Sequence, residues 1–218
     1  MLRLELMDTH QYVIFPSTPE ICPICHRYIV PIVIGAFNSL NNTYEVIFRC
    51  NNSACTHLFI ATYVYSKQAN KLVISKLNPK NSKPLELNDK IKSISPSFYK
   101  IYAQALEAEA LGLDEITGVG LRKALEFLIK DYCISKNPAK EGDIKKLLLA
   151  QVINNYMSDA SKIKTMATRA VWLGNDETHY VRKWEDKDIS HLKMLIDLTL
   201  HWIESELLTD EFEESMKK

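Results

Sequence analysis

The chain has no excess of charge of either sign, with 27 Lys and Arg residues against 27 Asp and Glu residues among 218. Proteins that bind nucleic acid over a large surface are strongly cationic, so this balance confines any nucleic-acid contact to a local patch. No apolar run is as long as a membrane span. We therefore expect a protein that does not cross a membrane.

A secretory leader is also missing from the first residues. No positively charged stretch leads into an apolar run after Met1. We therefore expect a cytoplasmic protein, in a compartment where thiols stay reduced.

A phosphate-binding glycine loop is lacking as well. Gly118 and Gly120 do not follow a strand, and they have neither the third glycine of a dinucleotide loop nor the Lys-Ser or Lys-Thr end of a P-loop. The sequence therefore does not predict a phosphate cradle here. Small residues that allow two helices to approach closely are the better explanation.

The chain does contain two close pairs of cysteines. Two residues separate Cys22 from Cys25, and four residues separate Cys50 from Cys55. Four thiolates in two such pairs, joined by a hairpin-length segment, are a ligand set of tetrahedral structural zinc sites. Two disulfides and four buried thiols are the alternatives. We expect a zinc ribbon whose Zn²⁺ is structural, because four thiolates leave no open position for water or substrate.

Three further residues bear on the metal site. His26 and His57 lie directly beside the cysteine pairs and are alternative ligands, although we favour the four cysteines. Cys133 lies on the apolar face of an expected helix, so we interpret it as a small core residue.

The sequence pattern changes near residue 78. Short β-rich runs alternate with turn residues before it, at 28–37, 43–50, 57–66 and 71–77. Helical periodicity dominates after it. The sequence predicts an α+β protein with a zinc-ribbon β domain at 1–78, a linker at 79–94 and an all-α helical bundle at 95–218.

Five helical segments are expected in the second domain. Ser95 caps the first, with Pro96 at its first position, and the second has the clearest apolar face. That face comprises Leu121, Ala124, Leu125, Leu128, Ile129 and Tyr132. Pro138 and Gly142 precede a shorter segment that contains Ile144, Leu147, Leu148 and Val152, and Ser158 or Asp159 caps the fourth.

The last helix starts near Asp188 and is apolar on two faces. Met194, Leu198 and Trp202 form the second face. A helix that is apolar on two sides is either central in its bundle or in contact with another subunit. We therefore expect a homodimer.

A polar segment that is able to carry chemistry follows the fourth helix. If the backbone stays helical through Gly174, Asn175 and His179 share one face; if the helix ends at Gly174, they lie in a loop. His179 is a candidate for proton transfer near neutral pH, with Asn175 orienting it and an arginine nearby for negative charge. The alternative is that these are turn and cap residues around a structural histidine.

Two motifs carry a resemblance to a known family. They are the Gly-Leu-Arg-Lys-Ala-Leu-Glu run that ends at Glu126 and the Leu-Gly-Asn-Asp-Glu-Thr-His run that ends at His179. Together with the cysteine pairs, they resemble prokaryotic proteins of domain-of-unknown-function family 4145 over most of the chain. Members stand alone or are fused to restriction-enzyme subunits, and their helical part is similar to HEPN domains. The resemblance implies a bacterial antiphage or restriction setting, with a companion defence protein as one possible partner.

Active HEPN ribonucleases cleave RNA without a metal, using an arginine and a histidine a few residues apart. His179 matches that histidine and Asn175 the polar residue that often precedes it. Arg169 lies too far before His179 for the usual spacing, so the motif is not intact, and Arg122 is the candidate that replaces it in space. Arg122 has an alternative role as the ion-pair partner of Glu126.

Two functions are therefore predicted. The first is a zinc-ribbon and HEPN-like recognition module that binds RNA, DNA or a partner protein, with basic and aromatic residues of the ribbon and linker such as Arg49, Tyr65 and Lys90 as candidate contacts. The second is a metal-independent HEPN-type ribonuclease that acts through His179 and an arginine, as a toxin or abortive-infection effector. The missing spacing favours the first.

Overall fold

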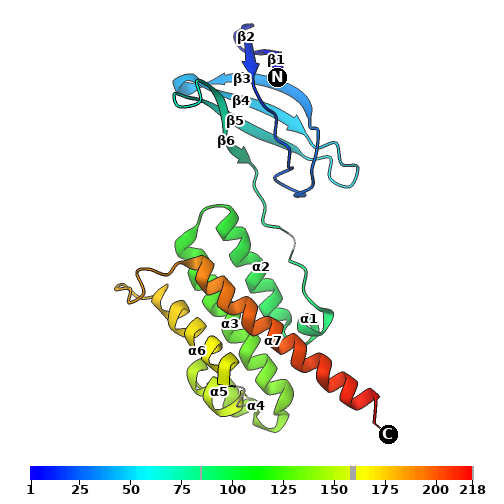
Figure 1. The fold of residues 1–218 in the computed structure, drawn as a ribbon, viewed down its shortest axis with the longest axis vertical. Helices are drawn as coiled ribbons and strands as arrows, with labels where there is room; N and C mark the ends of the chain where they lie inside the picture. The colour runs from blue at the N-terminus through cyan, green and yellow to red at the C-terminus, as the bar shows by residue number, and fades with distance from the viewer. Residues whose placement is uncertain (84, 158–160, 218) are drawn as a thin grey trace. The chain divides into compact units, whose positions relative to one another are not determined.

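The protein is α+β and divides into two compact units, Met1–Lys83 and Pro84–Lys218 (Figure 1). The structure is a computed structural model that describes residues 1–83, 85–157 and 161–217. All strands lie in unit 1 and all α-helices in unit 2, as the change in sequence pattern predicts.

Unit 1 is built on a four-stranded antiparallel sheet in the order β3-β4-β5-β6. Its strands are β3 (Ile32–Ser39), β4 (Thr43–Arg49), β5 (Leu58–Ser66) and β6 (Lys71–Asn78). All four strands were predicted, but the first begins at Ile32 rather than at residue 28, because Pro31 has no N–H to donate to the sheet. Asn41 and Asn42 both have positive φ in the turn between β3 and β4, a conformation that asparagine tolerates.

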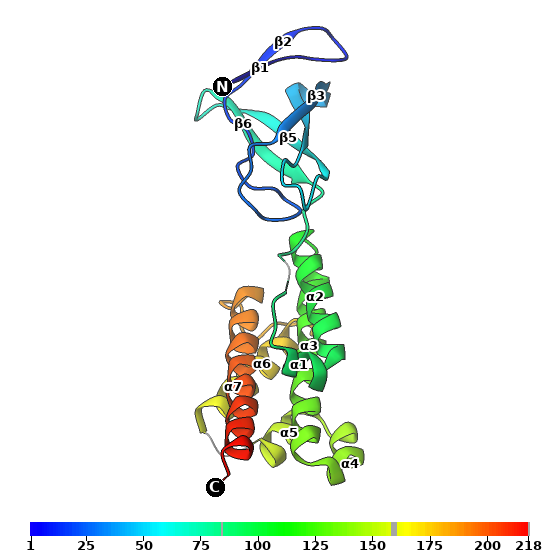
Figure 2. The ribbon, with the colours of Figure 1, turned by 90° about the vertical axis from the view of Figure 1, so that its right-hand side faces the viewer.

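A separate two-stranded hairpin, which the sequence pattern does not predict, pairs β1 (Leu2–Glu5) with β2 (Tyr12–Phe15) (Figure 2). It is joined to the large sheet where the Met7 N–H donates to the Ala36 carbonyl at 2.8 Å. The Phe15 ring is fully buried, with its centroid 4.8 Å from that of Tyr63 on β5. The hairpin therefore contributes to the core of unit 1.

Described residues at both ends of the linker predicted over 79–94 make contacts with the two units. The Asn81 N–H donates to the Pro23 carbonyl at 3.1 Å, and a His26 ring nitrogen lies 3.0 Å from the Ser82 carbonyl, so this stretch packs on the first cysteine pair. Helix α1 (Asp89–Ile94) then begins unit 2, capped by the Asn88 side chain. The contacts of Asn81 and Ser82 join residues far apart in the sequence, and the start of α1 depends on a single side-chain cap, so composition shows neither.

Unit 2 is a helical bundle around α3 (Asp114–Lys136), which packs against α2 (Pro96–Ala110), α5 (Leu149–Tyr156), α6 (Ser161–Asp176) and α7 (Ile189–Ser215). The six apolar residues predicted to form one face of α3 are all buried. Gly120 allows α2 to approach, since a Cβ at this position would lie 2.9 Å from that of Ala105. The close helix approach predicted for this glycine is confirmed.

The predicted helix starts are partly confirmed. Pro96 begins α2, but the Ser95 hydroxyl donates to Asp131 instead of capping the helix. The last helix, predicted to start near Asp188, begins at Ile189, and the Asp188 side chain caps it by accepting from the Ser190 and His191 N–H groups. The predicted caps Ser158 and Asp159 lie outside the described residues.

One predicted helix is two helices in the structure. The segment around residues 144–152 forms α4 (Glu141–Lys146) and α5, with a break between them. Leu148, one of the four apolar residues named in that segment, lies at this break and is 72% exposed. The extended backbone at Leu147 and Leu148 turns this side chain out of the apolar stripe.

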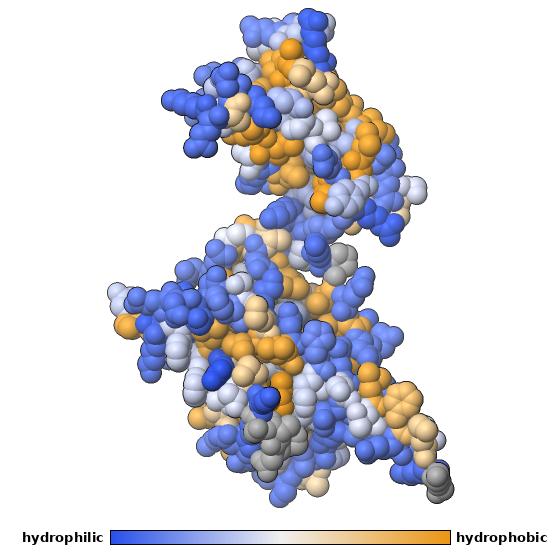
Figure 3. Space-filling view, viewed as in Figure 1, coloured by the Kyte–Doolittle hydropathy of each residue, from blue (hydrophilic) through white to orange (hydrophobic). Residues whose placement is uncertain are grey.

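The second face of α7 differs from the expected one. Trp202 is half-buried, and its ring packs edge-on against Tyr132, with the centroids 5.4 Å apart, so it belongs to the core. Met194, Leu198, Leu208 and Phe212 are exposed, and apolar surface gathers toward the C-terminal end of α7 in Figure 3. The homodimer stays a prediction.

No described helix combines the length and the apolar character needed to cross a membrane.

Candidate functional site

Four cysteines of unit 1 form a candidate metal site. The Sγ atoms of Cys22, Cys25, Cys50 and Cys55 all lie within 4.8 Å of one another. The Sγ–Sγ distance is 3.9 Å between Cys22 and Cys55 and 3.8 Å between Cys25 and Cys50. Because a disulfide needs about 2.05 Å, the disulfide alternative is wrong. The cluster is compatible with a metal ion.

The two cysteine pairs are held by matching backbone turns. The Cys22 N–H donates to the Arg27 carbonyl and the Cys50 N–H to the His57 carbonyl, both at 3.0 Å. In each turn the residue after the second cysteine has positive φ: His26 at 56° and Thr56 at 53°. These turns point the two thiols of each pair toward a common centre.

Burial disfavours the thiolate form of the buried cysteines in the cluster. It raises the pKa of the Cys50 thiol to about 12 and also raises the pKa of Cys55, whereas hydrogen bonds from the Arg27 backbone and from Cys22 outweigh burial at Cys25 and lower its pKa to about 7. Since metals bind thiolates, a cation that offsets their mutual repulsion favours the ionised form. The chemistry of the donor set therefore fits a metal ion.

The other candidate ligands lie differently. The His26 ring faces the Ser82 carbonyl, and the His57 Nδ1 lies 3.6 Å from the Cys55 sulfur as a hydrogen-bonding neighbour. Cys133 is fully buried in the helical core of unit 2, as predicted.

Unit 2 contains a pocket of about 720 Å³ where α6 meets the loop that leads to α7. Its lining includes Trp172, Asn175, Asp176, His179, Lys183 and Trp184. The Trp172 and Trp184 indoles are nearly parallel, with an interplanar angle of 5° and centroids 6.5 Å apart. They are 51% and 42% exposed. The pocket thus presents two partly exposed, parallel indole rings beside a lysine and a histidine.

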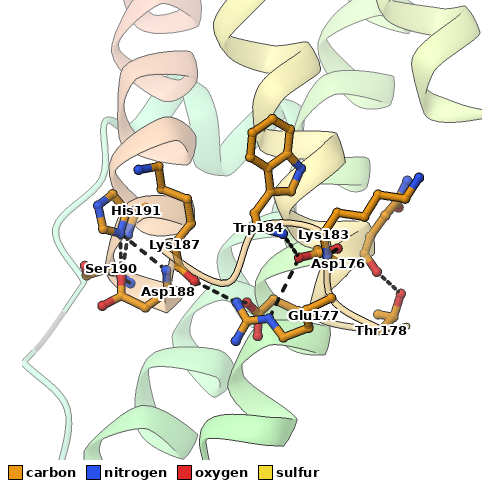
Figure 4. A network of polar contacts seen from close by, with 11 residues as sticks. Asp176, Glu177, Thr178, Lys183, Trp184, Lys187, Asp188, Ser190 and His191 are labelled. Atoms are coloured by element: carbon orange, nitrogen blue, oxygen red, sulfur yellow. Dashed lines mark hydrogen bonds and ion pairs between the residues drawn. The ribbon is translucent and has the colours of Figure 1, made fainter. Parts of the chain in front are cut away.

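Asp176, the last residue of α6, holds the loop against the pocket (Figure 4). Its carboxylate accepts the Lys183 N–H at 2.7 Å and the Trp184 N–H at 3.0 Å. Burial opposes the charge of this carboxylate, but the two N–H groups and the nearby Arg182 outweigh burial and lower its pKa. Asp176 is therefore ionised at neutral pH and fixes the backbone that carries Trp184.

Arg182 joins the two ends of the same loop. Its Nη2 donates to Glu177 Oε1 and to the Lys187 carbonyl, each at 2.7 Å. Glu177 packs against α3 at Gly118, where an added Cβ would lie 2.7 Å from the Glu177 Cβ. Gly118 thus leaves room for this side chain, a role that the sequence pattern did not predict.

The two motifs that carry the family resemblance meet in space. Arg122 Nε donates to Asn175 Oδ1 at 2.8 Å, and Arg122 Nη1 donates to Glu126 Oε2 at 3.0 Å. Gly174 lies inside α6 and does not end it. A Cβ at this glycine would lie 2.7 Å from the Arg122 Cδ, so its absence lets Arg122 reach across α6.

The four predicted catalytic candidates do not form one cluster. Asn175 and His179 both line the pocket, but His179 lies beyond the end of α6 and is exposed, so the two do not share a helical face. Arg122 contacts Asn175 and is anchored by Glu126. Arg169 is exposed on α6, and no hydrogen bond or ion pair joins it to His179 among the residues that the structure describes.

The two tryptophans of the pocket were missed in the sequence. The available signal is that two of the three tryptophans of the chain flank the polar segment around His179.

Two lysines of the predicted linker, named as candidate nucleic-acid contacts, form ion pairs within unit 2. Lys90 pairs with Glu211 and Lys92 with Asp89.

Comparison of the chain with protein-family models, curated proteins and solved structures gives no match. The assignment to family 4145 therefore stays a prediction, which rests on the motifs and cysteine pairs described above.

Proposed function

We propose that this protein binds single-stranded nucleic acid through the pocket formed by Trp172, Trp184, His179 and Lys183, and that unit 1 is a β module stabilised by zinc. The observation that carries the proposal is the pair of parallel, accessible indoles in that pocket. Unstacked bases pack on aromatic side chains in proteins that bind single strands, and each base stacked in this way contributes about 1–3 kcal/mol.

The charge of α6 supports this proposal. Between Ser161 and Asn175 the helix has basic residues and no acidic residue, although the whole chain is neutral. Lys162 and Arg169 are exposed on this helix, and Trp172 follows one turn later. A strand whose base stacks in the pocket would therefore find cations for its phosphates along α6.

The spacing of the cysteine sulfurs supports zinc as the metal. Four sulfurs that each lie about 2.3 Å from a tetrahedral Zn²⁺ are about 3.8 Å apart. The Sγ–Sγ distances from Cys22 to Cys55 and from Cys25 to Cys50 are close to this value. Four thiolates complete the coordination, so the ion would hold the turns of unit 1 together and take no part in a reaction.

A prokaryotic defence or restriction setting, with a HEPN-like helical unit, is the biological part of the proposal. It is supported by the contact of Arg122 with Gly174 and Asn175, because these residues come from the two motifs that resemble family 4145. The two motifs thus form one contact between α3 and α6.

Binding is tested by titrating labelled single-stranded RNA and DNA into the full-length protein. Trp172→Ala and Trp184→Ala should each weaken binding roughly tenfold, while Phe212→Ala, which removes an exposed aromatic ring from α7, should not. Wild-type affinity should fall as salt is raised, and Arg169→Gln should reduce that salt dependence, with Lys146→Gln on α4 as its control. Equal affinities for wild type and both tryptophan variants, or binding of a partner protein alone, would exclude the proposal.

The ribonuclease is the second candidate function, favoured by the presence of Asn175 and His179 in one pocket. We expect binding without cleavage, because Glu126 and Asn175 engage Arg122 and no described contact brings Arg169 to His179. RNA should stay intact with the purified protein in the presence of a chelator. Cleavage that disappears in His179→Ala would establish the ribonuclease instead.

A further inference from the structure

The amide of Asn175 has a defined orientation. Its Oδ1 accepts from Arg122 Nε at 2.8 Å. Since arginine has only donors, it selects the oxygen of the amide and not the nitrogen. No hydrogen-bond partner is recorded for Nδ2 within residues 1–83, 85–157 and 161–217, and Asn175 lines the pocket. The Nδ2 donor of this pocket-lining residue is thus left for a ligand, while the amide oxygen is directed to Arg122.

Arg122 is itself held in place from two sides. Its Nη1 donates to Glu126, and its aliphatic part lies against Gly174. Burial opposes the charge of Glu126, but hydrogen bonds from Lys130 and Arg122 lower the pKa of this carboxyl, so it stays ionised at neutral pH. Glu126, Arg122 and Asn175 therefore form a chain of contacts that begins on α3 and ends at the pocket.

We propose that this chain makes the pocket selective for guanine over adenine, because Arg122 turns the Asn175 amide oxygen toward its own guanidinium and leaves the Nδ2 donor for a base stacked on the indoles. The inference rests on the proposed binding of single-stranded nucleic acid. Guanine presents two neighbouring acceptors, O6 and N7, on one edge. Adenine presents an acceptor beside an N6 donor, and the usual two-bond pairing of asparagine with adenine needs the amide oxygen to face the base, whereas here it faces Arg122.

Arg122 and Glu126 act as positioning residues in this account. Without the guanidinium, the Asn175 amide is free to turn over and offer its oxygen. Adenine should then bind better relative to guanine, although the stacking surface is unchanged. If Arg122 had a purely structural role, its substitution would weaken the binding of guanine and of adenine to the same extent.

The test compares oligocytidine strands that carry one guanine or one adenine, bound to full-length protein. Wild type should prefer guanine by about three- to tenfold, the value of one net hydrogen bond. Asn175→Asp keeps the acceptor for Arg122 but loses the donor, so the preference should vanish while salt-dependent binding persists. Arg122→Lys should also reduce the preference, and Lys123→Gln, an exposed neighbour on α3, should leave it intact.

The outcomes separate the two proposals. Equal affinity of wild type for the two strands, with binding still weakened by Trp172→Ala, would overturn the selectivity and leave the proposed function standing. An unchanged preference in Asn175→Asp would likewise overturn the role of this amide. Absence of binding to both strands would overturn the proposed function and the selectivity together.

Discussion

Removal of the zinc ion that we propose for the cysteine cluster is expected to unfold unit 1 and leave unit 2 folded. Metal binding contributes on the order of 10 kcal/mol to the folding of structural zinc modules, comparable to the whole stability of a domain. In this chain the four thiols tie the loop before β3 to the loop between β4 and β5. Without the ion, the buried Cys50 and Cys55 thiols lose the partner that offsets the repulsion of their ionised forms.

The measurement is amide hydrogen exchange on the full-length protein before and after chelation, with zinc counted by elemental analysis. One zinc per chain should be released, and protection should disappear from β4 and β5 but persist in α3. Cys50→Ser should reproduce the loss, whereas Cys133→Ala, in the core of unit 2, should retain the metal. Undiminished protection of β5 in metal-free protein would contradict a structural role for the ion.

Asp176→Ala is expected to release the loop that carries Trp184 and to weaken nucleic-acid binding at least as much as Trp184→Ala. The substitution removes the acceptor of two backbone N–H groups and a charge beside Arg182. Hydrogen bonds to an ionised group contribute about 1.5–3 kcal/mol, and the freed N–H groups regain water when the loop opens. We expect a loss of about 2 kcal/mol in unfolding free energy, measured by denaturant titration.

Asp186→Ala is the matched control, because Asp186 lies in the same loop, is exposed and pairs only with the neighbouring Lys187 among the described contacts. It should bind nucleic acid as wild type does. Since the pKa of Asp176 is lower in the folded than in the unfolded chain, its stabilising effect is complete above the ordinary aspartate range and is lost as the pH falls through the lowered value. Unchanged tryptophan fluorescence in Asp176→Ala would contradict the claim that Asp176 holds the loop that carries Trp184.

Much of the fold was predictable because its signals are local. The apolar face of α3 follows from helix geometry, and the gathering of the four cysteines was predicted from a spacing that suits the ligands of a metal ion. The β1 and β2 strands were missed because each has only four residues, and burial of Phe15 against Tyr63 depends on the distant strand β5.

The candidate site was harder to predict because its contacts are long-range or involve the backbone. The polar segment around His179 was found, but nothing local shows that Arg122 ends on Asn175. Gly174 was interpreted as a possible helix end, whereas it makes room for a side chain of another helix. The acceptor role of Asp176 depends on which N–H groups the returning loop presents, and Trp172 and Trp184 become neighbours only through that loop.

The most direct test of nucleic-acid binding at the tryptophan pocket is ultraviolet crosslinking of single-stranded RNA to the full-length protein, followed by mass spectrometry of the joined peptides. Stacked aromatic side chains are well placed to react with the base they contact. The account predicts crosslinks within residues 172–184, at Trp172, Tyr180 or Trp184. Crosslinks confined to residues 1–83, with none in this segment, would contradict it.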